Sequence, residues 1–377
     1  MTSILIVAGE SSGDKHGARL VREFRAKHPG VSFFGIGGPR LAEEGVEVLF
    51  PMEELAVMGL VEVVSRLGRI RRIFHRLRRE AAKRKPRAAV LIDSPDFNLR
   101  LAKRLKRLGI PVLYYISPTV WAWRRGRLKT IKKTVAEMLL IFPFEQEIYR
   151  QAGIPAVFVG HPLVETVASR LTRADFFKKY GLDPNKKLIT LLPGSREGEM
   201  RRHLPVLDRT VPLLREAFGA RFVLVLAESL DEGLIERLMP ASIGDLLVLS
   251  RDGYEAMAAS DLVLSACGTA NLETALLGAP FLAFYRLSPL TYYAGKRFVK
   301  ISQYSIVNIL AGRPIVTELI QRRFTPQNLF RESKRLLDSE EDRSRLKEEF
   351  RKLHGLLGEE KASANAAREL EKLLDRA

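Results

Sequence analysis

The stretch ILIVAGESSGD at residues 4–14 decides the fold class of this chain. Five apolar residues of strand length lead into a loop of small and acidic residues, and residues 14–27 continue with helical spacing. A buried strand followed by a glycine-bounded loop and an amphipathic helix is the repeating unit of a parallel α/β sheet. Ligands of such sheets bind at the carboxyl ends of the strands, so residues 9–14 are expected to carry functional groups.

The same unit recurs along the chain. Further apolar runs alternate with helical stretches at residues 32–36, 88–92, 111–116, 138–142 and 156–159, and again at 188–192, 221–226, 246–249, 262–265 and 281–284. This rhythm predicts an α/β protein with two Rossmann-like, doubly wound parallel sheets that face an interdomain cleft. We expect domains at residues 1–165 and 170–345, with helices of about 345–377 completing the first.

Two such domains fit either a dehydrogenase or a glycosyltransferase of the GT-B type. The dinucleotide fingerprint GxGxxG is absent, because the segment GIGGP at residues 35–39 matches it only in part. No acidic ribose ligand follows a clean strand at the required spacing. NAD binding is therefore disfavoured.

The charge of the chain is concentrated in one region. The 377 residues contain 62 Lys and Arg against 44 Asp and Glu, a net charge of +18. Residues 66–133 hold 22 Lys and Arg against Glu80, Asp93 and Asp96, a net +19, so the remainder is close to neutral. A field this concentrated indicates an anionic partner: nucleic acid, an anionic membrane surface or a phosphorylated substrate. No RNA-binding motif accompanies it, so nucleic acid is the least favoured.

Metal sites and membrane spans are not expected. Cys267 is the only cysteine, and the six histidines form no HxxxH or HExxH pair. The apolar runs fall well short of the roughly 18–20 residues that cross a bilayer. The N-terminus enters a strand without a basic leader, which favours a cytoplasmic protein.

A basic segment at residues 55–85 combines apolar and cationic residues. Its apolar positions recur at spacings of three and four, which predicts a helix with one apolar face. Such a helix suits the surface of an anionic membrane, with Val61, Val63, Val64 and Leu67 as the expected lipid contacts. The alternative is that this stripe packs on the protein's own sheet.

Three loops of the first half carry candidate residues. Glu10, Ser12 and Asp14 follow the first strand and are expected at an acceptor site, although Ser12 or Asp14 alone would also suit a helix cap. Asp93 ends another strand within the basic region, where a carboxylate is well placed as a general base.

The same half offers supporting groups. Asp96 is assigned to capping the next helix, whereas Asn98 is expected in the cleft. Trp123 and Arg124, after the strand at 111–116, are expected to wall an acceptor pocket, although tryptophans are more often core residues.

The second half contains a candidate nucleotide site. Ser195 and Arg196 follow a strand and open a helix, where phosphate binds well. Gly268 and Thr269 repeat that arrangement, and Glu273 lies one turn further along, within reach of ribose hydroxyls. Asn308 is expected to bond the diphosphate or the sugar. Arg196 and the helix start at Gly268 and Thr269 would neutralise a leaving diphosphate without a metal.

Taken together, these motifs resemble the lipid A disaccharide synthase family. They follow one another in order through most of the chain: GESSGD (9–14), MEELAVMG (52–59), DSPDFN (93–98), SPTVWAW (117–123), FPFE (142–145), VGHP (159–162), LPGSR (192–196), CGTA (267–270) with Glu273, and NILAGR (308–313). Two positions depart from the family pattern, since Cys267 replaces a usual Ser and Thr317 a common Pro.

The resemblance implies a GT-B fold and an inverting, metal-independent transfer with no cofactor. The donor would be UDP-2,3-diacylglucosamine and the acceptor 2,3-diacylglucosamine 1-phosphate, giving a β-1,6-linked disaccharide phosphate and UDP. It also implies peripheral attachment to the cytoplasmic face of the inner membrane. Another UDP-sugar-dependent GT-B enzyme, such as a lipid-linked glycosyltransferase or a UDP-sugar epimerase, is the alternative, and a homodimer is left open.

Overall fold

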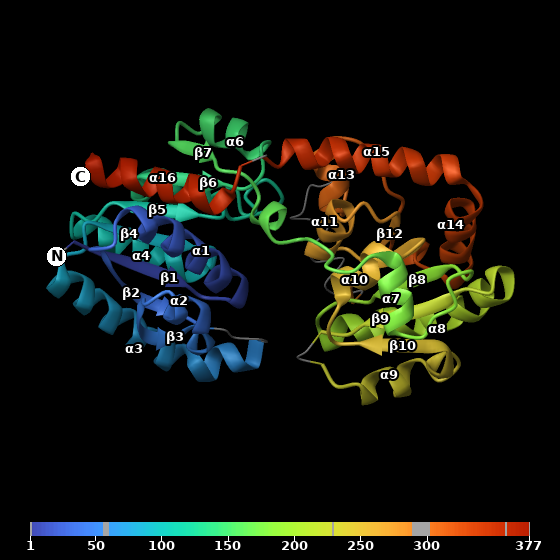
Figure 1. The fold of residues 1–377 in the computed structure, drawn as a ribbon. Helices are drawn as coiled ribbons and strands as arrows, with labels where there is room; N and C mark the ends of the chain where they lie inside the picture. The colour runs from blue at the N-terminus through green and yellow to red at the C-terminus, as the bar shows by residue number, and fades with distance from the viewer. Residues whose placement is uncertain (1, 56–59, 228–229, 289–301, 359, 377) are drawn as a thin grey trace. The chain divides into compact units, whose positions relative to one another are not determined.

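The computed structural model describes residues 2–55, 60–227, 230–288, 302–358 and 360–376, without the side chains of residues 60–67. Contacts divide the chain into two compact units, Met1–Glu165 with Leu357–Ala377 and Thr166–Leu356. Each unit is a parallel sheet between layers of helices (Figure 1). The predicted α/β class with two parallel sheets is confirmed.

The sheet of the first unit has seven parallel strands in the order β3-β2-β1-β4-β5-β6-β7. Its strands are β1 (Ser3–Ala8), β2 (Ser32–Gly37), β3 (Glu47–Pro51), β4 (Ala88–Ile92), β5 (Val112–Tyr115), β6 (Glu137–Leu140) and β7 (Ala156–Phe158). The strand order reverses between β1 and β4, which pair from Ile4 opposite Ala88 to Ala8 opposite Ile92. A reversal of this kind opens a crevice at the carboxyl ends of the two strands, where ligands of α/β sheets bind.

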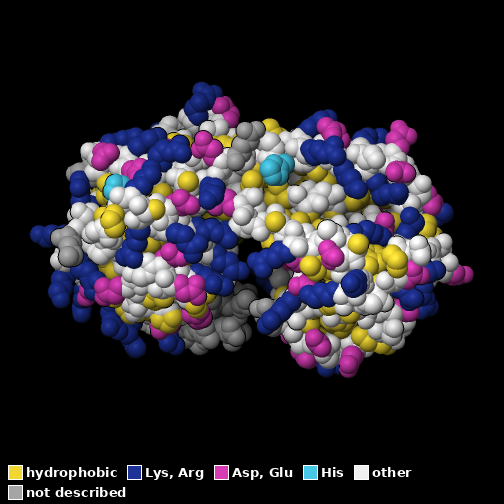
Figure 2. Space-filling view, in the orientation of Figure 1, with side chains coloured by type: hydrophobic (Ala, Val, Ile, Leu, Met, Phe, Trp, Pro, Cys, Tyr) yellow, Lys and Arg dark blue, Asp and Glu magenta, His cyan; other side chains and the backbone are white. Residues whose placement is uncertain are grey.

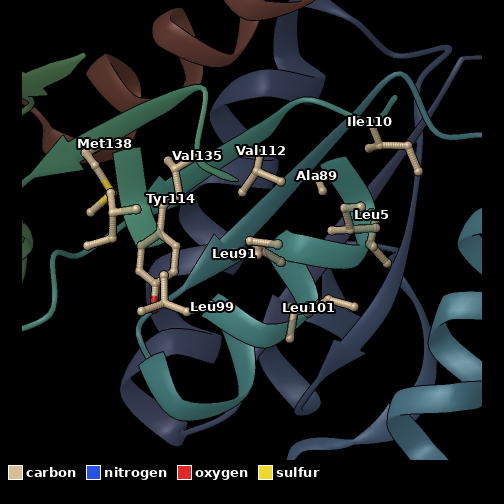
Figure 3. Close-up of a cluster of buried hydrophobic side chains, with 14 of the residues drawn as sticks. Leu5, Ala89, Leu91, Leu99, Leu101, Ile110, Val112, Tyr114, Val135 and Met138 are labelled. Carbon is tan, nitrogen blue, oxygen red and sulfur yellow. The ribbon is translucent and has the colours of Figure 1, made fainter. Parts of the chain in front are cut away.

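Helices cover both faces of this sheet. They are α1 (Ser11–Lys27), α2 (Pro39–Glu43), α3 (Leu60–Arg84), α4 (Pro95–Arg107), α5 (Arg127–Thr134), α6 (Glu145–Gln151) and α16 (Ala362–Asp375), with short 3-10 turns η1 (Met52–Glu54) and η2 (Pro162–Glu165). One core layer lies under α3 and α4, and Figure 3 shows Leu91, Leu99 and Leu101 packed there. The other layer lies under α1 and α16 and includes Leu370, which has no exposed surface.

The second unit repeats this design with six parallel strands in the order β10-β9-β8-β11-β12-β13. Its strands are β8 (Leu188–Leu192), β9 (Arg221–Val225), β10 (Leu246–Leu249), β11 (Leu262–Ala266), β12 (Phe281–Tyr285) and β13 (Glu318–Ile320). Its helices are α7 (Arg173–Lys179), α8 (Glu197–Phe218), α9 (Gly233–Leu238), α10 (Gly253–Ala259), α11 (Thr269–Leu276), α13 (Ile306–Ala311), α14 (Pro326–Asp338) and α15 (Glu340–Leu356), with 3-10 turns η3 (Ile243–Asp245) and η4 (Gln321–Arg323). The order reverses between β8 and β11, so this unit also has a crevice at its strand ends.

The chain returns to the first unit later than the sequence predicted. The return was expected at about residue 345, but α15 remains with the second unit, and only residues from Leu357 onward join the first. The reason is packing, because the ring of Phe350 stacks on that of Phe281 with centroids 5.6 Å apart. In the first unit, α16 then lies against α1.

Candidate active site

The strand reversal in the first unit brings two loops together. Ala8 and Ile92 are opposite each other at the carboxyl ends of β1 and β4, so the loops that begin at Gly9 and Asp93 are neighbours. A Cβ on Gly9 would lie only 2.5 Å from the hydroxyl oxygen of Ser94. A side chain at position 9 would therefore displace the Ser94 side chain, at the point where the two loops meet.

The backbone of Asp93 is held in a strained conformation. Asp93 and Ser94 have φ values of +47° and +43°, which costs a non-glycine residue about 1–2 kcal/mol. The carbonyl oxygen of Asp93 accepts hydrogen bonds from the Asn98 side-chain amide at 2.8 Å and from the Tyr114 hydroxyl. Strain that is held in place by buried hydrogen bonds is a frequent property of functional positions.

The carboxyl of Asp93 suits proton transfer near neutral pH. The side chain is half-buried, and burial raises its pKa to about 6, with a further contribution from the negative charge of Glu10. A hydrogen bond from the Ser94 backbone and the positive charge of Arg127 act in the opposite direction. A pKa close to the working pH favours general base catalysis, because the group is ionised yet still basic.

Asp14 and Asn98 were predicted to lie at the acceptor site or in the cleft, but both side chains are buried and form hydrogen bonds with the backbone. The Asp14 carboxylate accepts backbone N–H groups from Gly38 at 2.7 Å, Arg40 at 3.0 Å and Leu41 at 3.2 Å, at the start of α2. The side-chain amide of Asn98 donates to the carbonyls at the end of β4. These residues hold the loops in place, whereas Glu10 and Ser12 are exposed beside them.

The loop after β5 places a charged cluster on the surface. Asp96 does not cap α4 as predicted, because Ser94 occupies the N-cap position. Its carboxylate instead pairs with Arg124 at 3.1 Å and Arg127 at 2.8 Å. Trp123 is 41% exposed, and its ring lies 4.4 Å from the Arg124 guanidinium carbon. The tryptophan is therefore a surface platform for cations and not a core residue.

In the second unit, the loop after β8 is organised by a carboxylate that sequence analysis missed. Glu199 accepts the backbone N–H groups of Ser195 at 3.1 Å and Arg196 at 3.3 Å. It also pairs with the Arg196 side chain at 3.2 Å and accepts the Tyr285 hydroxyl at 2.8 Å. Gly194 has a φ of +120°, and a Cβ there would lie 2.5 Å from the Glu199 carboxylate. The loop N–H groups are thus occupied, while the Arg196 side chain is 71% exposed.

A buried histidine ties this loop to the neighbouring strand end. The Nε2 atom of His203 accepts the backbone N–H of Arg286 at 3.0 Å, so Nδ1 carries the proton and donates to the Pro193 carbonyl at 2.6 Å. Burial lowers the pKa of His203, which keeps the ring neutral. The ends of β8 and β12 are therefore linked through one imidazole.

The loop after β11 leaves the start of α11 open. Gly268 and Thr269 are exposed there, at a helix terminus that favours anions. Glu273 lies on the same helix, and one of its oxygens accepts the Tyr254 hydroxyl at 2.9 Å. Burial raises the pKa of the neighbouring Cys267 thiol, which therefore stays protonated.

Asn308 was expected to bond the diphosphate or the sugar, but its side-chain amide forms hydrogen bonds within the protein. Its nitrogen donates to the Val316 carbonyl at 2.9 Å and to Glu318 at 2.8 Å. Its oxygen accepts the backbone N–H groups of Ile315 at 2.8 Å and Val316 at 2.9 Å. Asn308 is 1% exposed and holds the turn after α13. It therefore acts on this edge of the sheet as a positioning residue.

One known protein family matches nearly the whole chain, across both units. The model of the lipid-A-disaccharide synthetase family matches residues 4–372. The chain belongs to the lipid-A-disaccharide synthetase family. The predicted resemblance is confirmed, and membership makes the chain a glycosyltransferase.

Close relatives of this family member are similar along their whole length. A lipid-A-disaccharide synthase of Myxococcus xanthus is 45% identical over 373 residues, covering 98% of this chain and 97% of the relative. One from Solibacter usitatus is 41% identical over 376 residues, covering 100% and 98%. The family pattern therefore spans both units.

Solved structures with the same fold are more distant. A UDP-GlcNAc 2-epimerase from Neisseria meningitidis, bound to UDP-GlcNAc, aligns over all of both chains with a TM-score of 0.66 and 13% identity. The calicheamicin glycosyltransferase CalG4 aligns with a TM-score of 0.61 and 14% identity, covering 100% of this chain and 99% of that one. At this identity the likeness concerns the fold alone, and it does not favour an epimerase over the synthase.

The basic region of this synthetase family member contains a cavity beside α3. It has a volume of about 380 Å³ and is lined by Phe50, Glu54, Arg69, Arg72, Ile73 and Arg76. Figure 2 shows Lys and Arg side chains over much of the visible face of the first unit. Ile73 and Leu77 are buried against the sheet, so part of the apolar stripe packs internally. The side chains of Val61, Val63, Val64 and Leu67 lie outside the described residues.

The described residues contain neither a candidate membrane span nor a candidate metal-binding cluster. Among the described helices, none is long and apolar enough to cross a membrane. Within the same part of the chain, no group of three or more His, Cys, Asp or Glu is placed to hold a metal ion.

Sequence analysis did not predict several residues that form these sites. Tyr114 has the sequence pattern of an ordinary core residue of β5, and Arg127 is one of many cations in its region. Glu199 carried a usable signal, because a carboxylate three residues into a helix is typical of a capping box. Tyr285 carried none, since its partner lies 86 residues away.

Proposed function

We propose that this chain transfers a diacylglucosaminyl group from UDP-2,3-diacylglucosamine to the 6-hydroxyl of 2,3-diacylglucosamine 1-phosphate. The bond between the donor's anomeric carbon and the diphosphate oxygen breaks, and a bond from the acceptor oxygen forms on the opposite face. The products are the β-1,6-linked disaccharide 1-phosphate and UDP. The observation that carries this proposal is the state of Asp93, a half-buried carboxyl with a pKa of about 6 at the strand reversal of a chain in this family.

In this mechanism Asp93 is the general base. Its carboxylate takes the proton of the acceptor hydroxyl as the oxygen attacks, and becomes a neutral carboxylic acid. The burial that raises the pKa of Asp93 also favours this neutral product. Asn98 and Tyr114 keep this carboxyl in position, because both donate hydrogen bonds to the backbone carbonyl of Asp93.

The second unit supplies the donor site in this proposal. The electron pair of the broken bond passes to the diphosphate, whose growing negative charge must be stabilised. Arg196 offers an exposed guanidinium, and Gly268 and Thr269 offer the open start of α11. Glu273 would accept the ribose hydroxyls. Ser195 and Asn308 act through the backbone, by shaping the loops that carry these groups.

The proposal also includes attachment to the cytoplasmic face of the inner membrane. Both substrates carry acyl chains, so the acceptor unit must work close to a lipid surface. Support comes from the cavity that displays Arg69, Arg72 and Arg76, because each cation near an anionic surface contributes about 1 kcal/mol to binding.

Mass spectrometry of the reaction tests the whole proposal. The protein is incubated with UDP-2,3-diacylglucosamine and the acceptor monosaccharide phosphate. We expect a disaccharide monophosphate together with an equal amount of UDP. A donor that is converted into its 2-epimer, with no new glycosidic bond, would support the epimerase alternative instead.

A further inference from the structure

The cluster around Asp96 gathers two arginines at one exposed carboxylate. Two guanidinium groups converge on one carboxylate, with Arg124 at 3.1 Å and Arg127 at 2.8 Å from the same oxygen. The Asp96 side chain is 73% exposed, so solvent reaches the centre of the cluster. The Arg124 side chain is 49% exposed, so its pair with Asp96 contributes little to folding. The Arg127 side chain is 13% exposed and is held by the fold, with its guanidinium directed at the exposed carboxylate. Folding stability therefore does not explain why Arg124 joins Arg127 at this carboxylate.

The two arginines are positioned by more than Asp96. The guanidinium carbons of Arg124 and Arg127 lie 4.4 Å and 5.5 Å from the centre of the Trp123 ring. The ring is anchored in turn, because its Nε1 donates to the Thr119 hydroxyl at 3.0 Å. Arg124 also has a backbone φ of +52°, a left-handed conformation that is uncommon for residues other than glycine. The pair would keep its geometry if another anion replaced the carboxylate.

The net charge of the cluster favours the binding of another anion. Two cations face one exposed carboxylate, so the cluster itself has a net charge of +1. A guanidinium matches phosphate as well as it matches carboxylate, through paired N–H···O bonds. A phosphate carries more negative charge than Asp96 and would compete with it for both arginines.

The cluster lies beside the proposed base. Asp96 follows Asp93 by three residues, in the first turn of α4. Burial is the main cause of the raised pKa of Asp93, and the charge of Arg127 acts against it, so Arg127 lies within electrostatic range of the carboxyl. A substrate that presents a hydroxyl to Asp93 would have its far side near the cluster.

We propose that Arg124 and Arg127, stacked on Trp123, bind the phosphate of the phosphorylated sugar acceptor, and that this phosphate displaces the carboxylate of Asp96. The inference rests on the proposed function and assigns the acceptor's phosphate to a defined pair of arginines. The pair selects phosphorylated monosaccharides over unphosphorylated ones. Asp96 occupies the pair in the empty enzyme.

A binding experiment with a water-soluble probe tests this without turnover. Glucosamine 1-phosphate is titrated into the protein while tryptophan fluorescence is followed, with glucosamine as the unphosphorylated comparison. We expect saturable binding of the phosphate only. The double variant R124Q/R127Q should bind it about tenfold or more weakly, the effect of losing charge-assisted hydrogen bonds. The control R125Q removes one exposed charge from the same loop and should change affinity by about twofold at most.

A second variant gives an effect of opposite sign. Asp96→Asn removes the competing carboxylate and keeps the shape of the side chain, so glucosamine 1-phosphate should bind several times more tightly. A purely structural role for Asp96 predicts equal or weaker binding. Circular dichroism verifies that each variant is folded. Unchanged affinity in folded R124Q/R127Q, or equal or weaker binding in folded D96N, would overturn the inference.

Kinetics separate this inference from the proposed function. In R124Q/R127Q, KM for the phosphorylated acceptor should rise about tenfold or more, while KM for the UDP donor stays constant. The preference for the phosphorylated acceptor over its dephosphorylated form should fall by a similar factor. If wild-type protein forms no disaccharide with either acceptor, the proposed function fails, and the fluorescence titration still decides whether the arginine pair binds a sugar phosphate.

Discussion

The side-chain amide of Asn98 donates to the carbonyl oxygen of Asp93 over 2.8 Å, and the second unit contains the same device. There, the amide of Asn271 donates to the carbonyl of Ala266, at the end of β11, over 3.0 Å. Both asparagines are fully buried, and both lie in the first turn of the helix that follows the strand at the reversal point. Each unit thus uses one buried amide to fix the loop that carries its functional groups.

Removing either amide should therefore damage a different half of the reaction. Asn98→Ala should lower kcat by about tenfold or more with little change in UDP affinity, because Asp93 loses its support. Asn271→Ala should weaken UDP binding and affect the chemical step less. Each change should lower the free energy of unfolding by about 1–3 kcal/mol, since buried carbonyls lose a donor. Calorimetric titration with UDP and steady-state kinetics would measure both, and identical effects of the two variants would contradict this division.

The pH dependence of the reaction should report Asp93. A base with a pKa of about 6 gives a rate that rises as pH increases through that value. The negative charge of Glu10 contributes to the raised pKa, after burial, so Glu10→Gln should lower it. The acidic limb of the kcat/KM profile should then move to lower pH. The same exchange at Glu43, an exposed residue of α2, is the control and should leave the limb in place.

The raised pKa of Asp93 also has a consequence for stability. The folded pKa lies above the ordinary value of 3.8, so the folded state holds the proton more tightly than the unfolded state. The stabilisation is complete below about pH 3.8 and is lost as pH rises through about 6.

Glu199 should prove essential for UDP binding although it is not expected to touch the nucleotide. Glu199→Ala frees the backbone N–H groups of Ser195 and Arg196, so the loop and the Arg196 side chain lose their orientation. We expect UDP affinity to fall about tenfold or more and stability to fall by about 1–3 kcal/mol. Glu197→Ala, an exposed position in the same turn, is the matched control. Equal UDP affinity in the two variants would rule out the positioning role.

Membrane attachment should depend on the cavity beside α3. The variant R72Q/R76Q removes two cations that line it, and should weaken binding to phosphatidylglycerol vesicles by about tenfold or more. R78Q/R79Q removes the same charge from exposed positions of the same helix that do not line the cavity. Vesicle sedimentation compares the two. Equal losses would mean that general charge, and not the cavity, governs attachment.

Features that depend on a local sequence pattern were predicted, whereas features that depend on contacts between distant residues were not. Eleven of the thirteen described strands were predicted because they are short apolar runs, and Asp93 was found because it directly follows one. The edge strands β3 and β13 were missed, because each is short and begins with a glutamate. The internal hydrogen bonds of Asp14 and Asn308 were not predicted, because their partners, Gly38 and Val316, belong to turns that local patterns do not reveal. The return of the chain at Leu357 was placed too early for a similar reason, since the contact of Phe350 with Phe281 spans many residues.

Turnover and UDP binding by Asp93→Asn, measured on the same preparation, test the central claim most directly. The change removes the basic carboxylate and keeps the size of the side chain. The account predicts that kcat falls by a factor of about 100 or more, as for the loss of a general base, while the Kd for UDP stays within about twofold. Disaccharide formation at the wild-type rate by this variant would contradict the account.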